Sequence, residues 1–275
     1  MRKRFGSALR IGLSKNGASV VHTSGWLQTR YEVVAETSIS EEEGSSPEVM
    51  AMKLGALLKD ANCSRLPVRI VLSDSWVRRW MVVPPQNATR LADCQAAASA
   101  RFQALFGDAI SEWHLAADWD ARNPFLVCAI PRLLLDALQQ VARDRRLVLL
   151  EIAPQFVVAW NRWRADLKEG AWFGVLHQQV LTFAVLGQNG PGVTREVVLP
   201  GEVMLHQHLM PEILAREALR LNVPVPSEIR LCGQIPAHWV MQEIRNMTFV
   251  RLDRLRLANV PLSADALLAF TGMQS

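Results

Sequence analysis

Several features that mark well-known classes of protein are missing from this sequence. Only one tyrosine occurs among 275 residues, and the longest apolar stretches, Leu147–Leu150 and Phe156–Trp160, are far too short to cross a bilayer. The basic start Met1–Arg4 is not followed by an apolar run of signal-peptide length. Gly-x-Ser-x-Gly, His-Glu-x-x-His and phosphate-loop motifs are also missing. We therefore expect a cytoplasmic chain that associates with a membrane only through a partner.

Cysteine and histidine are too sparsely placed to indicate a metal site. His206 and His208 lie two residues apart on a predicted helix, so they do not share a face. No two cysteines have Cys-x-x-Cys spacing. We expect no bound metal, and we expect the four cysteines to be small buried residues in a reducing compartment: Cys63, Cys94, Cys128 and Cys232.

The bulk composition indicates a folded chain with a mild charge. Half of the residues are apolar, which is enough for one large core or two medium ones. The net charge of +4 is too small for the concentrated basic face of a dedicated nucleic-acid binder, so we expect no nucleic-acid partner. Nine tryptophans are expected mainly in cores and between domains, with a few left for an interface.

One order of predicted elements occurs twice along the chain. Each half begins with three strands, continues with a helix and then has an apolar strand. In the first half, the Asn16–Gly17 pair predicts a tight turn with positive φ. The segments of the first half are Ala8–Leu13, Ala18–Thr23, Trp26–Ala35, a helix from Pro47 to about Ala61, and Val68–Ser73. Those of the second are Ala171–His177, Val180–Leu186, Val193–Leu199, a helical stretch Gly201–Leu221 kinked or restarted at Pro211, and Glu228–Cys232.

This repetition predicts an α/β protein of two related lobes with a cleft between them. Lobe I is expected over residues 1–168 and lobe II over residues 169–275. A small inserted subdomain is expected over about residues 84–131 of lobe I. A tail helix over Ala264–Phe270, with Ser263 as its cap, closes the chain.

Three stretches carry a resemblance to a known family. They are the run Arg10–Val21, the strand Val68–Asp74 with its continuation Arg78–Pro84, and Ile152–Pro154 leading into Trp160 and Asn161. Together with the duplicated order of elements, they resemble the actin-like ATPase superfamily. The PilM proteins and the cytoplasmic domains of type II secretion L-proteins are the most similar members. The resemblance implies an actin-like (ribonuclease H-like) duplicated fold.

The nucleotide site implied by this resemblance is degenerate in sequence. In active members, backbone amides of two hairpin turns hold the phosphates and carboxylates organise Mg²⁺. Ser14 stands where the first turn should have Asp, Asn16 where Gly is expected, and His177 begins a second turn without Asp-x-Gly. Gly233 is the one glycine kept from the usual pair of the adenosine-side turn. We therefore expect no bound cofactor and no catalytic residue.

Two residues near these turns, Lys15 and His177, each allow a functional and a structural interpretation. Lys15 could contact a phosphate, but an exposed turn lysine is the simpler interpretation. His177 could be a general base, but no partner for it is evident. A nuclease of the related ribonuclease H-like class is argued against because the strand Ala8–Leu13 carries no carboxylate.

The resemblance implies a non-catalytic cytoplasmic scaffold of a type IV pilus or type II secretion-like assembly. Its implied partners are the cytoplasmic tail of a bitopic inner-membrane protein and an assembly ATPase. We expect the tail to contact the cluster Trp76, Arg78, Arg79 and Trp80, because Trp and Arg are favoured at interfaces. The competing interpretation is that strand alternation buries both tryptophans while the arginines face water.

Two other functions remain open at this point. One is an actin-like ATP-binding protein, ATPase or kinase with unorthodox phosphate turns. The other is a free-standing regulatory or ligand-binding domain. Calorimetry with ATP and the identity of neighbouring genes would separate these functions from the scaffold.

Overall fold

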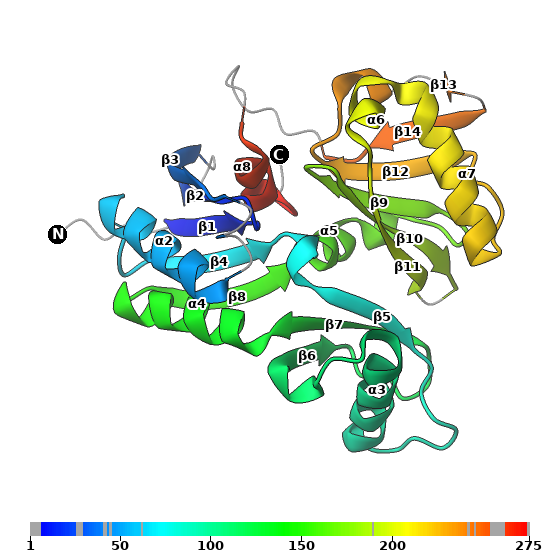
Figure 1. Ribbon diagram of the computed structural model, residues 1–275, viewed down its shortest axis with the longest axis horizontal. Coiled ribbons are helices and arrows are strands. Elements are labelled where there is room, and N and C mark those ends of the chain that lie inside the picture. Colours follow the sequence, from blue (N-terminus) through cyan, green and yellow to red (C-terminus); the bar gives the residue numbers. More distant parts are fainter. Residues whose placement is uncertain are drawn as a thin grey trace.

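The structure is a computed structural model that describes residues 7–25, 30–40, 43, 46–61, 63–188, 190–240, 243–244, 246–253 and 262–273. The basic start Met1–Arg4 and the first residues of the predicted third strand, 26–29, lie outside the described residues. Figure 1 shows two larger α/β bodies and a smaller one below them.

The first lobe is built on a five-stranded sheet with the order β3-β2-β1-β4-β8. β1 pairs antiparallel with β2 and parallel with β4, and β4 pairs parallel with β8. Helices α2 and α4 pack against each other, and together with the sheet they enclose the core of this lobe. The elements are β1 (Ala8–Leu13), β2 (Gly17–Ser24), β3 (Arg30–Ser38), α2 (Pro47–Asp60), β4 (Pro67–Leu72), α4 (Arg132–Asp144), β8 (Val148–Pro154), α5 (Gln155–Trp163) and η3 (Arg164–Asp166).

The second lobe repeats this plan on a sheet with the order β11-β10-β9-β12-β14-β13. β9 pairs antiparallel with β10 and parallel with β12, and β12 pairs parallel with β14. The elements are β9 (Trp172–His177), β10 (Val180–Gly187), β11 (Gly190–Val198), α6 (Gly201–Leu205), η4 (Gln207–Leu209), α7 (Met210–Leu221), β12 (Glu228–Gly233), η5 (Ala237–Trp239), β13 (Glu243–Ile244) and β14 (Met247–Arg251).

The two lobes therefore share strand order and strand direction, which confirms the predicted duplication. β1, β2, β3, β4 and β8 correspond in turn to β9, β10, β11, β12 and β14. The helical stretch of the second lobe restarts at Met210 with Pro211 in its first turn, as the sequence predicts, because proline needs no amide donor there.

A small subdomain is inserted between β4 and α4. Its three-stranded sheet has the order β5-β7-β6 and packs with α3 around Trp80, Phe102 and Phe125. Because β5 belongs to this sheet, the subdomain begins before residue 84, the boundary expected from the sequence. The elements are η1 (Asp74–Trp76), β5 (Arg78–Val82), α3 (Leu91–Phe106), η2 (Ile110–Glu112), β6 (Trp113–Ala117) and β7 (Phe125–Pro131).

The last helix, α8 (Ala264–Phe270), returns to the first lobe and packs on β1 and β2, where Figure 1 draws it in red beside blue strands. The Ser263 hydroxyl accepts the Ala266 amide at 3.0 Å, which confirms the predicted cap. Arg10 of β1 donates to the carbonyls of Ala269 and Thr271, each at 2.6 Å. The chain thus returns from the second lobe to the first, and these contacts hold α8 against the first sheet.

The turn at Asn16–Gly17 is present, but its predicted backbone conformation is wrong. Neither residue has a positive φ, and the turn closes through the Ser14 amide, which donates to the Gly17 carbonyl at 2.9 Å. Glycine is required at position 17 for a different reason. A Cβ there would lie 2.5 Å from Asp265 Oδ2 and 2.6 Å from the Thr37 carbonyl oxygen.

All four cysteines are buried, as predicted. Burial raises the pKa of the Cys128 thiol to about 12 and that of Cys232 well above its usual range, so neither is a thiolate near neutral pH. No helix in the described part of the chain is long and apolar enough to cross a membrane.

We predict that Gly12→Ala destabilises the protein by about 1–3 kcal/mol, the usual cost of overpacking. A Cβ at position 12 would lie 2.0 Å from the Asp265 carbonyl oxygen and 2.7 Å from the Ala269 amide nitrogen, both in α8. The measurement is the free energy of unfolding in urea. The matched control is Gly55→Ala within α2, where the nearest atom is 3.9 Å away. That change should stabilise the helix by roughly 0.5–1 kcal/mol. Equal stability of the two variants would contradict the close packing of α8.

Candidate functional site between the lobes

Two equivalent hairpin turns, one from each lobe, meet at the cleft. The β1–β2 turn belongs to the first lobe and the β9–β10 turn to the second. The Asn16 side-chain amide donates to Gln178 Oε1 across the interface at 3.2 Å. Ser14 Oγ accepts the Asn16 amide at 3.1 Å, and Gln234 Oε1 accepts the Gln178 amide at 2.8 Å. Both backbone amides therefore have side-chain acceptors from the protein itself.

A third turn, at the end of β12, is bonded in the same way. The Gly233 amide donates to Asp253 Oδ2 at 2.7 Å. Burial raises the pKa of the Asp253 carboxyl, while this hydrogen bond and Arg251 act in the opposite direction. Gly233 has φ +95°, and a Cβ there would lie 2.3 Å from the Leu176 carbonyl oxygen, so only glycine fits.

His177 lies at the centre of the cleft and is almost completely buried. Its Nδ1 is 3.3 Å from Ser73 Oγ, and its Nε2 is 3.4 Å from Asp265 Oδ1. The order Ser–His–Asp is that of a nucleophilic triad. Ser73 and His177 are only 2 % and 3 % exposed, however, so a substrate has no path to the hydroxyl. The contact joins three parts of the chain: the segment directly after β4, the end of β9, and α8.

A buried arginine connects the two lobes. The Arg79 side chain is 5 % exposed and forms ion pairs with Asp74 at 2.8 Å and with Glu196 of β11 at 2.7 Å. It also donates to Thr182 Oγ1 of β10 at 3.2 Å. Asp74 Oδ1 in addition accepts the Phe156 amide at 3.2 Å. Burial raises the pKa of the Glu196 carboxyl, and Arg79 opposes the shift.

This arrangement of two duplicated lobes and an inserted subdomain occurs in solved structures that align with nearly the whole chain. A chain of a PilM–PilN type IV pilus biogenesis complex superposes with a TM-score of 0.60 and 15% identity, over 98% of this chain and 96% of that one. A protein of Bacteroides thetaiotaomicron with an actin-like ATPase fold gives 0.58 and 11%, over 90% and 91%. This chain has the actin-like fold.

The cytoplasmic domain of EpsL, an inner-membrane component of the type II secretion system of Vibrio cholerae, is also similar. It superposes on this actin-like chain with a TM-score of 0.59 and 11% identity, over 97% of this chain and 94% of that one. No family model matches the sequence, and no curated protein matches it.

The four degenerate positions predicted from the sequence lie around the inter-lobe cleft of this actin-like fold. Ser14 and Asn16 are in the first turn, His177 ends β9, and Gly233 ends β12. In active members of the fold, the backbone amides of the turns are free and donate hydrogen bonds to phosphate oxygens. Here, an anion would first have to displace hydrogen bonds that each contribute about 1 kcal/mol.

Three carboxylates near the cleft were missed by the sequence analysis, which looked only inside the turns. Asp265 reaches the first turn from α8, Asp74 follows β4, and Asp253 follows β14. Asp74 and Asp253 are already held by Arg79 and Arg251. Within the described residues, no three His, Cys, Asp or Glu side chains converge to hold a metal ion. The start of the tail helix was the one sequence signal for Asp265.

The predicted partner cluster divides into buried and accessible members. Trp76 and Trp80 are buried, and Arg79 is held in the ion pairs between the lobes. The Arg78 side chain is 49 % exposed and lies over the rings of Phe106 and Trp113. Contact with a partner stays a prediction, and Arg78 is the member with the most surface to offer.

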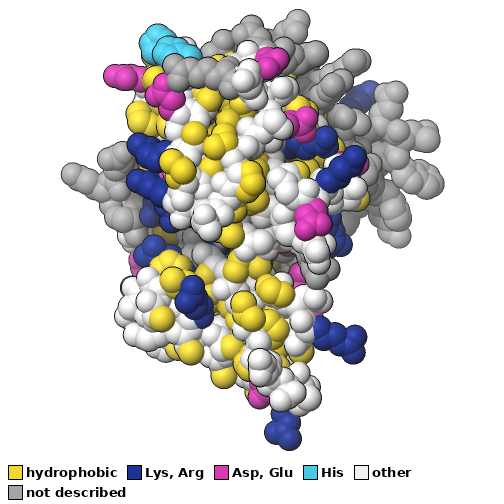
Figure 2. Space-filling model, turned by 90° about the vertical axis from the view of Figure 1, so that its right-hand side faces the viewer, with side chains coloured by type: hydrophobic (Ala, Val, Ile, Leu, Met, Phe, Trp, Pro, Cys, Tyr) yellow, Lys and Arg dark blue, Asp and Glu magenta, His cyan; other side chains and the backbone are white. Residues whose placement is uncertain are grey.

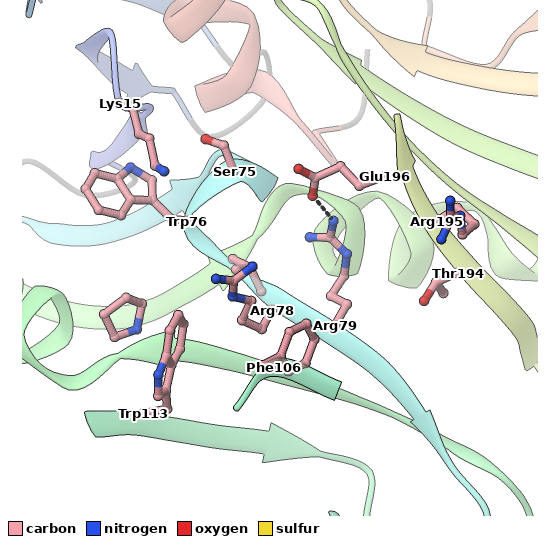
Figure 3. A pocket seen from close by; sticks show the side chains of 12 residues that line it. Lys15, Ser75, Trp76, Arg78, Arg79, Phe106, Trp113, Thr194, Arg195 and Glu196 are labelled. Atoms are coloured by element: carbon pink, nitrogen blue, oxygen red, sulfur yellow. Dashed lines mark hydrogen bonds and ion pairs between the residues drawn. The ribbon is translucent and has the colours of Figure 1, made fainter. Parts of the chain in front are cut away.

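Trp76, Arg78 and Arg79 border a cavity of about 380 Å³ at the junction of both lobes and the inserted subdomain, whereas Trp80 does not line it. Figure 3 shows Lys15 beside the Trp76 ring, and Arg78 next to Phe106 and Trp113. Arg195 and Glu196 of β11 form the opposite wall. The cavity therefore combines cationic side chains with aromatic rings.

We predict that Arg79→Met destabilises the protein by about 3–5 kcal/mol, because it leaves the buried Asp74 carboxylate without its cation. The double variant Asp74→Asn/Arg79→Met should recover part of that loss, since the buried Asp74 charge is removed and the remaining carboxylate, Glu196, is 37 % exposed and can be solvated. Urea denaturation measures both. The neighbouring Arg78→Met is the control and should cost less than about 1 kcal/mol. A similar loss for Arg78→Met and Arg79→Met would show that Arg79 does not hold the lobes.

Proposed function

We propose that this chain is a non-catalytic cytoplasmic scaffold of a type IV pilus or type II secretion-like assembly. In this proposal, it docks the cytoplasmic tail of a bitopic inner-membrane protein, reaches the membrane only through that partner, and passes contacts to an assembly ATPase. No nucleotide or metal takes part.

One observation carries the non-catalytic part of the proposal. The turn amides of Asn16, Gln178 and Gly233 each donate to a side chain of the protein. The Asn16–Gln178 hydrogen bond also joins the two turns directly. A nucleotide would have to separate them and would meet the Asp265 carboxylate beside Gly17. Repulsion between this carboxylate and a phosphate adds to the loss of those hydrogen bonds.

The assembly part of the proposal is supported by similarity along the whole chain. The PilM–PilN and EpsL structures align with almost all of this chain and almost all of their own length, inserted subdomain included. The first belongs to a type IV pilus biogenesis complex, and the second is the cytoplasmic domain of an inner-membrane component of a type II secretion system. The similar length and arrangement of elements support a similar role in an assembly for this chain.

The proposal includes no nucleic-acid partner. Figure 2 shows the face at the right of Figure 1, where Lys and Arg side chains are interspersed with acidic and apolar ones over the second lobe and the inserted subdomain. This face offers no continuous basic track for a phosphate backbone.

We expect isothermal titration with millimolar Mg²⁺–ATP to give no saturable heat, because the amides that would bind phosphate are engaged. An actin-like protein known to bind ATP, measured under the same conditions, is the positive control. Saturable heat that depends on Mg²⁺ would favour the alternative function, an actin-like ATP-binding protein with unorthodox turns.

We also expect the immobilised cytoplasmic tail of a bitopic membrane protein encoded beside this chain to retain the purified chain without nucleotide. A tail of the same composition in scrambled order is the control. Equal retention on both tails, or none on either, would contradict the scaffold role.

A further inference from the structure

A different cavity lies within the first lobe, on the sheet face that α8 and α5 cover. Helix α8 packs on β1 and β2, and α5 contacts β4 and β8. A cavity of about 310 Å³ is lined there by the sheet, by α5 and by Gly272 just after α8. It belongs to one lobe and is separate from the hairpin turns of the cleft.

The sheet wall of this cavity is a row of charged residues on adjacent strands. Arg10 of β1 is the register partner of Arg69 of β4, and Arg69 is the partner of Glu151 of β8. The neighbouring positions on β1 and β4 point the other way, into the core beneath α2 and α4. A face covered by helices is ordinarily apolar, and charges placed on it need partners.

Arg162 of α5 adds a third guanidinium to the cavity. It lies over the ring of Trp163, and its Nε is buried without a hydrogen-bond acceptor in the described part of the chain. Arg69 has a carboxylate partner, since its Nε is 3.6 Å from Glu151 Oε2. A buried N–H without an acceptor is costly, so an anion in the cavity would satisfy a group that the fold leaves open.

The hydrogen bonds of Arg10 go to uncharged partners, the carbonyls at the end of α8. Burial and the neighbouring Arg69 lower the pKa of Arg10 to about 10, with Glu151 opposing, so its guanidinium is still charged at neutral pH. Among the described residues that line the cavity, three guanidinium groups therefore face one carboxylate. The surplus of two positive charges matches a dianion.

The size and the lining of the cavity favour a small ligand. Its volume is near the lower end of the range for ligand pockets, about 300–1,000 Å³. Ile70 and Val158 place apolar groups beside the cations. Arginine is well suited to phosphate, because its N–H groups can donate to two oxygens at once. A carboxylate would bring only one negative charge.

We propose that this cavity binds a phosphate dianion, as the free ion or as the phosphate of a small monoester. Arg69 and Arg162 donate to its oxygens, and Arg10 adds a positive charge that its bonds to α8 hold in place. This assignment does not depend on the scaffold function.

The test is isothermal titration of inorganic phosphate into the full chain in a phosphate-free buffer. One phosphate should bind, and sulfate should compete with it, because both are tetrahedral dianions. Arg69→Gln/Arg162→Gln should weaken binding by about tenfold or more, since two charge-assisted contacts are lost. The matched control Arg101→Gln/Arg122→Gln removes the same charge from exposed positions outside the cavity and should change the affinity by less than about twofold.

Glu151→Gln is a second variant with an effect of opposite sign. It removes the carboxylate that lines the cavity, which repels an anion and competes with it for Arg69. Phosphate should therefore bind about threefold more tightly, or better. A purely structural role of these residues would not produce tighter binding.

Absence of saturable heat at millimolar phosphate, or equal binding by wild type and Arg69→Gln/Arg162→Gln, would overturn the site. Nitrate at matched ionic strength should not compete, and competition equal to that of sulfate would reduce the effect to charge screening. Glycerol 3-phosphate distinguishes the two sources, since tighter binding than phosphate assigns a monoester and weaker binding the free ion. Binding confined to vesicles of phosphatidic acid would make the ligand a lipid surface and overturn the small-ligand assignment.

Discussion

The Arg79 guanidinium is the group on which the arrangement of the lobes depends. It lies at the point where the chain leaves the first lobe for the inserted subdomain, and it pairs there with Asp74 and across the cleft with Glu196. An unpaired charge at this depth would cost several kcal/mol, so the two carboxylates must stay close to it. The same side chain therefore fixes β5, β10 and β11 relative to one another.

This fixed spacing has a direct consequence for the cleft. With the lobes held together, the two hairpin turns approach closely enough for Asn16 to reach Gln178. His177 is enclosed between Ser73 and Asp265 at the same time. Each of these contacts joins segments far apart in the sequence. The hydrogen bond between the turns and the burial of His177 therefore both follow from the close approach of the two lobes.

The sequence was sufficient to predict the repeated order of strands and helices, because alternation and turn residues are local signals, but the helix expected over Pro236–Ile244 is wrong: η5 and the strand β13 lie there. It was not sufficient for Arg79, since alternation places Arg78 and Arg79 on opposite faces of a strand without showing which face meets Glu196 of the other lobe. The turn at Asn16–Gly17 was predicted from a positive φ that it does not have. Glycine is needed there because Asp265, from the other end of the chain, approaches it closely. Contacts between the two ends of the chain have no local signal.

A cleft closed by its own side chains changes what the fold can do. In a nucleotide-driven machine, ligand binding and release shift the lobes between states, and the ligand must bind those states with different affinity. Here protein side chains accept hydrogen bonds from the turn amides, and the ion pairs of Arg79 join the lobes at the junction with the inserted subdomain. Under the proposed function, this junction keeps one geometry. A surface of constant shape suits the proposed docking role, because its affinity for a partner is then independent of a nucleotide cycle.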